Sequence, residues 1–205
     1  MSYLPLVFIS ALIHAYIGWR LLPALVDVAW ALPVLGGTLL LSAVLIPCGL
    51  LARRVRSRPL SHLLGWAGLT FMGLCSSLFV LTAARDLGLL LAHLVLAFAP
   101  TAFELPSWAR NSAAAVALGA AFITLIGLWN ARRTAAVVAI DVPIRNLPAA
   151  LHGFRIAQIS DIHIGPTIKR GYLQAIVDAV NRLDADMVAV TGDLVDGPVA
   201  ELGGH

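Results

Sequence analysis

An aspartate and a histidine stand two positions apart, as Asp161 and His163, directly after a mostly apolar run at residues 154–160. A second apolar run, residues 186–192, ends in a glycine that Asp193 follows. Imidazole and carboxylate ligands together favour Mn, Fe, Zn or a similar ion over Ca or Mg. These residue types in this pattern therefore indicate a transition-metal site, and metal-assisted hydrolysis is the chemistry that such a site would serve.

Each of these residues also has an ordinary structural interpretation. An aspartate after a strand often caps a helix or forms an Asx turn, a Gly-Asp pair often forms a plain turn, and a lone surface histidine is usually only solvated. Their positions favour the metal site, because both motifs follow predicted strands of one strand-helix-strand unit and lie about thirty residues apart, the usual length of such a unit.

The elements that position these residues are predicted by the pattern of apolar side chains. Residues 154–160 and 186–192 read as strands. Residues 169–185 carry apolar residues on one face of a predicted helix, at Leu173, Ile176, Val177, Val180 and Leu183. Strand, helix and strand in this order predict a right-handed parallel crossover, whose strand carboxyl ends open onto one crevice. A spacing of two along an extended backbone also places Asp161 and His163 on the same side.

One more strand is predicted at residues 136–144, where β-branched residues are frequent. Pro143 and Pro148 confine it to a sheet edge or a turn. We therefore predict two domains: a transmembrane helical region at residues 1–133 and a partial α/β domain at residues 134–205.

The part of the chain before these strands is predicted to lie in a membrane. Hydrophobic residues make up 60% of the whole sequence and charged residues 12%, against about half and about a quarter in a typical soluble domain. A spanning helix needs about 20 apolar residues. Runs near that length occur at residues 4–22, 29–51, 63–83, 87–103 and 113–128. The run at 87–103 is short and interrupted by His93 and Pro100, so a bundle of four or five spans is predicted.

The number of spans decides the side of the C-terminal part. If the arginine-rich loop RRVRSR, residues 53–58, is cytoplasmic, five spans place that part outside and four place it inside. We favour five, and hence an extracytoplasmic C-terminal domain of a multi-pass protein in a bacterial inner membrane. No basic stripe interleaved with aromatic residues occurs in the soluble part, which argues against nucleic acid as a partner.

His14 and His93 both fall inside apolar runs, where an ionisable residue raises the question of a functional site. Each is alone in its run, so interhelical hydrogen bonding is favoured over a proton or metal role. Cys48 and Cys75 also lie in apolar runs and are expected to be buried thiols.

The stretches FRIAQISDIHIGP and DMVAVTGDLVDG together resemble the opening of the calcineurin-like metallophosphoesterases, specifically the bacterial branch with an N-terminal membrane region. That family pattern, D-x-H and then G-D-x-x-D or E, reads here Asp161-Ile162-His163 and Gly192-Asp193-Leu194-Val195-Asp196. The resemblance implies a four-layer α/β/β/α fold that holds two divalent transition-metal ions. It also implies that Asp161 and His163 bind the first ion, that Asp193 bridges both, and that Asp196 supports the ligands from behind.

The later motifs of that family, G-N-H-D or E, a further histidine and G-H-x-H, do not occur in this sequence. They carry the remaining ligands and the catalytic histidine. The chain is therefore expected to be an N-terminal portion of such an enzyme, with its catalytic residue unknown.

Three functions compete on this basis. The first is a membrane-anchored, metal-dependent phosphoesterase whose partners are the lipid bilayer and a phosphate ester, with a lipid-linked ester as one candidate. The second is a catalytically inactive small integral membrane protein with a truncated phosphoesterase remnant. The third is a transporter or channel that uses His14 or His93, which ranks last because the sequence shows neither paired intramembrane charges nor inverted repeats.

Overall fold

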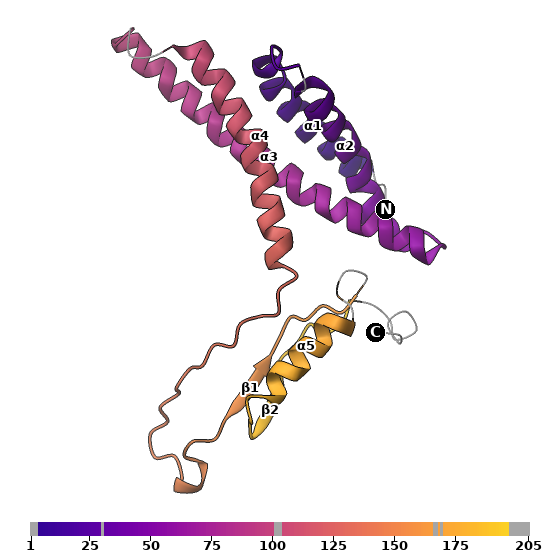
Figure 1. Ribbon diagram of the computed structural model, residues 1–205, viewed down its shortest axis with the longest axis vertical. Helices are drawn as coiled ribbons and strands as arrows, with labels where there is room; N and C mark the ends of the chain where they lie inside the picture. The colour runs from indigo at the N-terminus through magenta and orange to yellow at the C-terminus, as the bar shows by residue number, and fades with distance from the viewer. Residues whose placement is uncertain (1–3, 30, 101–103, 166–167, 169, 197–205) are drawn as a thin grey trace. The chain divides into compact units, whose positions relative to one another are not determined.

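A computed structural model describes residues 4–29, 31–100, 104–165, 168 and 170–196 of the chain. The chain divides into two compact units, Met1–Ala131 and Arg132–His205. The first is helical, and the second contains two strands and a helix (Figure 1). The domain boundary predicted between residues 133 and 134 stays a prediction.

Among the described residues of the helical unit, four helices are long and apolar enough to cross a membrane. A π-helical turn at Leu32–Gly36 leads into the second of them. Large apolar side chains such as Leu40, which is 74% exposed, face outward, as expected of a surface in contact with lipid. The four helices are α1 (Leu4–Leu21), α2 (Gly37–Leu50), α3 (Arg58–Phe98) and α4 (Leu105–Asn130).

The two predicted runs at 63–83 and 87–103 lie largely in the single helix α3, which has 41 residues. No proline occurs between Pro59 and Pro100, so nothing in the sequence breaks the backbone hydrogen bonding between the runs. A helix of this length extends about 62 Å, twice the roughly 30 Å of a bilayer's hydrocarbon core, and a straight helix cannot turn back. Residues 87–98 therefore do not form a separate returning span; residues 101–103 lie outside the described residues.

The long helix α3 packs against different partners along its length: α1 and α2 lie beside its first part and α4 beside its second (Figure 1). The crossing of α2 and α3 is close at Gly49 and Gly68. A Cβ added to Gly68 would lie 2.6 Å from the Cα of Gly49. Only glycines allow the two backbones to approach this closely, which is a common basis for helix association in membranes.

His14 forms the interhelical hydrogen bond that the sequence predicts. Its Nδ1 donates to the carbonyl oxygen of Ser10 at 2.6 Å, which leaves Nε2 to accept from the hydroxyl of Ser42 on α2 at 2.9 Å. For His93 the same expectation stays a prediction: its Nδ1 donates to the carbonyl of Leu89 on its own helix at 2.7 Å.

An ion-pair cluster joins α1, α3 and α4, and it contradicts the expectation that the helical region lacks paired charges. Asp86 accepts hydrogen bonds from Tyr16 and from Arg20 Nε, each at 2.8 Å. Arg85, with a side chain only 4% exposed, lies 3.5 Å from Asp86 and donates to the carbonyl of Ala109 on α4. The adjacent opposite charges of Arg85 and Asp86 between two apolar runs were the sequence signal, but the partners of Asp86 on α1 are more than sixty positions away.

The second unit contains β1 (Ile156–Ile159), α5 (Arg170–Asn181) and β2 (Met187–Val190). The strands pair in parallel, from Ile156 opposite Met187 to Ile159 opposite Val190, which confirms the predicted parallel arrangement. All three elements are shorter than the predicted segments, because the residues at their ends form the turns and loops that join them.

The predicted strand at residues 136–144 is wrong: these residues are exposed and have no regular secondary structure. Pro143 has no N–H to donate, and none of the described residues supplies a partner strand for this segment. The described part of this unit is therefore one strand-helix-strand unit with a two-stranded sheet, and it does not show the four layers that the resemblance implies.

Candidate metal centre

The candidate ligands lie on two loops that follow the carboxyl ends of β1 and β2. The pairing of the strands continues into these loops, since Asp161 N donates to the carbonyl of Gly192 at 3.2 Å and His163 N to that of Asp193 at 2.9 Å. A further parallel bridge pairs Ile164 with Val195. Two segments about thirty residues apart are thus held side by side by main-chain hydrogen bonds, as the strand order predicts.

The three candidate ligands share an uncommon backbone conformation. Asp161, His163 and Asp193 have φ values of 57°, 52° and 45°, in the left-handed region, which costs a residue with a Cβ about 1–2 kcal/mol. We expected an extended backbone to place Asp161 and His163 on one side, and this is wrong because the backbone is not extended at either residue. Left-handed turns at both positions aim the side chains, while Ile162 between them is buried at 5% exposure.

The ligand atoms of Asp161, His163 and Asp193 all lie within 4.8 Å of one another, and all three residues are exposed. His163 Nε2 is 4.0 Å from Asp193 Oδ2. Two ligands on one ion, each about 2.1 Å from it, can be at most about 4.2 Å apart. The set therefore fits a single cation after a closing movement of about half an ångström.

Asp196 lies beside His163, on the Nδ1 side of its ring. The Nδ1 of His163 donates to Asp196 Oδ1 at 2.9 Å. This bond fixes the ring and leaves Nε2 on the side of Asp193. The hydrogen bond to Asp196, followed by the negative charge of that carboxylate, raises the pKa of His163 above its usual value.

Asp196 itself is held by the backbone. Its N–H donates to the carbonyl of Ile164 at 2.9 Å. Gly165 packs against its side chain, and a Cβ added there would lie 3.3 Å from Asp196 Cβ. Sequence reasoning missed one support of this edge, the hydrogen bond from Gln158 Nε2 to Thr191 Oγ1 at 3.1 Å. A polar residue in an otherwise apolar strand was the available signal.

Comparisons with known proteins match part of the chain to one protein family. Residues 154–203 match the family model described as "Calcineurin-like phosphoesterase". The chain is 44% identical over 82 residues to a transmembrane protein with metallophosphoesterase domain from Danio rerio, which is 40% of this chain and 19% of that protein. A protein of the same description from Bos taurus is 36% identical over 80 residues, 39% of this chain and 18% of that protein.

A bacterial protein, the UDP-2,3-diacylglucosamine pyrophosphatase LpxG of Chlamydia muridarum, is 43% identical over 47 residues, 23% of this chain and 14% of that protein. The chain thus spans less than a fifth of the curated relatives it matches. No solved structure matches it.

These matches support a calcineurin-like metallophosphoesterase domain in the C-terminal part of the chain. Members of that family use divalent metal ions and are hydrolases. The relatives include animal as well as bacterial proteins, so the matches do not single out a bacterial branch.

Proposed function

We propose that this chain is part of a membrane-anchored phosphoesterase in which Asp161, His163 and Asp193 bind divalent transition-metal ions of the Mn, Fe or Zn class. The observation that carries the proposal is the convergence of three ligand atoms within 4.8 Å from two neighbouring strand ends. Asp193 would bridge two ions, since a carboxylate offers two oxygens. The mixed imidazole and carboxylate ligands suit this class of metal.

The metal centre would polarise a phosphate ester and provide a nucleophile from water at neutral pH. The protein's own contribution is orientation. Asp196 holds the Nδ1 proton of His163, so that Nε2 is the atom left to bind metal. Asp161, Asp193 and Asp196 bring three carboxylates to one exposed edge, and bound cations would offset their mutual repulsion.

The test is a comparison of Asp193→Asn with Asp178→Asn in protein purified from its native membrane. Asp178 lies on α5, where its carboxylate accepts a hydrogen bond from Gln174. We expect Asp193→Asn to lose Mn²⁺ binding and hydrolysis of an aryl phosphate together, and Asp178→Asn to keep both. Mn²⁺ binding without hydrolysis in the unsubstituted protein would favour the inactive membrane protein, and equal binding by both variants would contradict the site.

We also propose that the C-terminal unit lies on the cytoplasmic side. Four helices that each cross once return the end of α4 to the side of the 53–58 loop. That side then carries the RRVRSR loop and the pair Arg132 and Arg133, with no acidic residue in these segments. These six arginines outnumber the three that lie toward the opposite side, Arg20, Arg85 and Arg110, so the positive-inside rule favours this orientation. It is the reverse of the side that a five-span count favours.

Reporter fusions after residue 131 test this orientation. Fluorescence of a fused cytoplasmic reporter, with no activity of a fused periplasmic alkaline phosphatase, is the expected result. Alkaline phosphatase activity would indicate an odd number of spans and would contradict the cytoplasmic orientation.

The finer proposal about substrate is a lipid-linked phosphate ester. The Chlamydia relative acts, by its name, on a diacylated sugar nucleotide, and the helices here would keep the site beside a bilayer. We expect faster hydrolysis of a phosphate ester presented in mixed micelles than of the matching water-soluble ester. Equal rates would remove this proposal and leave the phosphoesterase proposal intact.

A further inference from the structure

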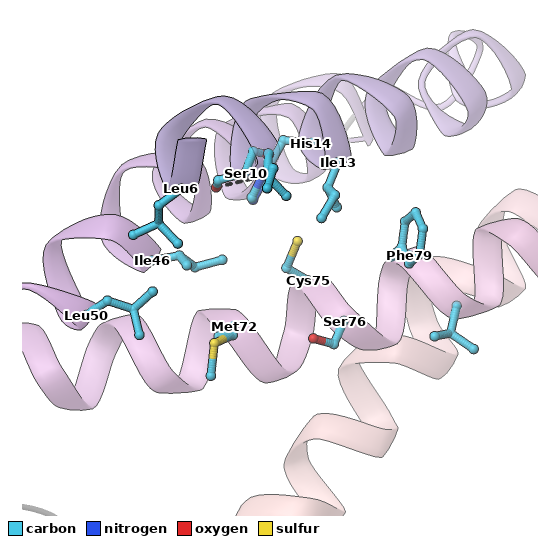
Figure 2. Close-up of a pocket in the computed structure, with 12 residues that line it drawn as sticks. Leu6, Ser10, Ile13, His14, Ile46, Leu50, Met72, Cys75, Ser76 and Phe79 are labelled. Atoms are coloured by element: carbon cyan, nitrogen blue, oxygen red, sulfur yellow. Dashed lines mark hydrogen bonds between the residues drawn. The ribbon is translucent and has the colours of Figure 1, made fainter. Parts of the chain in front are cut away.

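A cavity of about 370 Å³ lies between α1, α2 and α3. Cys75 and Phe79 project from α3 toward α1, Ile13 projects back from α1, and Ile46 and Leu50 line the end formed by α2 (Figure 2). Its volume lies within the range of about 300–1,000 Å³ that is usual for small-molecule sites.

The cavity offers little to water. Its lining is almost entirely apolar, and both ring nitrogens of His14, its one ionisable imidazole, are already bonded, to Ser10 and Ser42. An apolar cavity of about 150 Å³ stays dry and accepts apolar molecules. Because these helices are long and apolar enough to span a membrane, lipids are the apolar molecules that would surround this cavity.

The length and position of the cavity match one leaflet of a bilayer. The lining runs from Leu6 to His14 along α1 and from Met72 to Val80 along α3. Eight residues of helix extend about 12 Å, against about 15 Å for half of the hydrocarbon core. One end lies at Leu50, the last residue of α2. The other end lies at His14, ten residues and thus about 15 Å along α1 from Leu4, which would be near the middle of a bilayer.

A basic segment begins immediately beyond the end at Leu50. The RRVRSR loop follows within a few residues, and the side chains of Arg56 and Arg58 are exposed. Exposed arginines at a membrane surface attract anionic lipid headgroups and bind phosphate. The basic loop and the cavity therefore lie in the same leaflet of the bilayer.

We propose that the cavity between α1, α2 and α3 binds one acyl chain of an anionic phospholipid whose phosphate lies at the 53–58 loop. The site is separate from the candidate metal centre, and it requires neither metal nor hydrolysis. The lipid fills the gap between α1 and α3 and joins these helices where their side chains do not meet.

The test is native mass spectrometry of the full chain after delipidation, with phosphatidylglycerol or phosphatidylcholine added back. Ile9→Trp would fill the cavity, because Ile9 lines it and is 56% exposed. Leu40→Trp is the matched control, since Leu40 is 74% exposed and lies outside the lining. We expect one retained phosphatidylglycerol per chain, unchanged in Leu40→Trp and reduced about tenfold in Ile9→Trp, the effect of excluding about two methylene groups.

The headgroup has its own arm of the experiment. Replacing Arg56 and Arg58 with glutamine should remove the preference for phosphatidylglycerol over phosphatidylcholine. Equal retention of lipid by the two tryptophan variants would overturn the cavity, and an unchanged lipid preference after the arginine substitutions would overturn the assignment of the phosphate.

A second measurement covers the case in which Ile9→Trp does not fold. A phospholipid with a photoreactive acyl chain, incorporated into membranes with the unsubstituted protein, should label Met72 and Phe79 more than the lipid-facing Leu40 and Val44. Equal labelling of the two groups would show that only ordinary surrounding lipid contacts the protein, and would overturn the proposal.

Discussion

The hydrogen bond between His163 Nδ1 and Asp196 Oδ1 provides a sensitive test of the candidate metal centre. Asp196→Asn keeps the size of the side chain but removes the charge that orients the imidazole. Loss of such a partner behind a ligating histidine lowers metal affinity by about 10- to 100-fold. The His163 and Asp196 side chains are each 44% exposed, and water can replace part of the contact, so we expect about tenfold.

Isothermal titration with Mn²⁺ at pH 8 measures this loss, with Asp178→Asn as the control. Asp196 raises the pKa of His163, and a protonated imidazole cannot bind metal. In the unsubstituted protein, protons therefore compete with the metal for His163 at a higher pH than they would for an ordinary histidine. In Asp196→Asn the pKa returns toward its ordinary value, and this competition begins at lower pH. The affinity difference should therefore narrow as the pH falls. A difference of less than twofold at pH 8, or one that widens on acidification, would refute the reasoning.

Two further predictions concern the helical unit. Gly68→Ala places a Cβ 2.6 Å from a backbone atom of α2, whereas Gly73→Ala meets nothing within 4 Å. Overpacking costs about 1–3 kcal/mol, so thermal unfolding in detergent should occur at a lower temperature for Gly68→Ala but not for Gly73→Ala. Equal melting temperatures of the two variants would contradict the close crossing. Asp86→Asn removes the counter-charge of a neighbouring arginine that is 4% exposed. Because Asp86 itself is 22% exposed, the free energy of unfolding should fall by an amount near the lower end of about 3–5 kcal/mol. Asp27 is exposed, so Asp27→Asn should melt at the same temperature as the unsubstituted protein. Equal stability of these two variants would show that the ion-pair cluster contributes nothing.

Prediction from the sequence succeeded where the signal was local. The alternation and run length of apolar residues identified β1, α5 and β2, and the parallel order followed from the helix between two strands. Prediction failed at residues 136–144, because β-branched residues favour a strand only where another strand supplies hydrogen bonds. It also failed to join residues 58–98 into one helix, since a charged pair inside an apolar run ends a hydropathy segment without ending the helix.

The sequence by itself determined that most of the chain is suited to a bilayer and that Asp161, His163 and Asp193 follow strand ends, because composition, periodicity and residue type are properties of the chain alone. The tertiary structure decided what depends on distant partners. The left-handed turns at the candidate ligands lie where two loops pair through their backbones. The hydrogen bonds of Asp86 come from Tyr16 and Arg20 on another helix, and the contact of Gly49 with Gly68 requires two helices to cross. Such contacts form only when packing brings remote residues together.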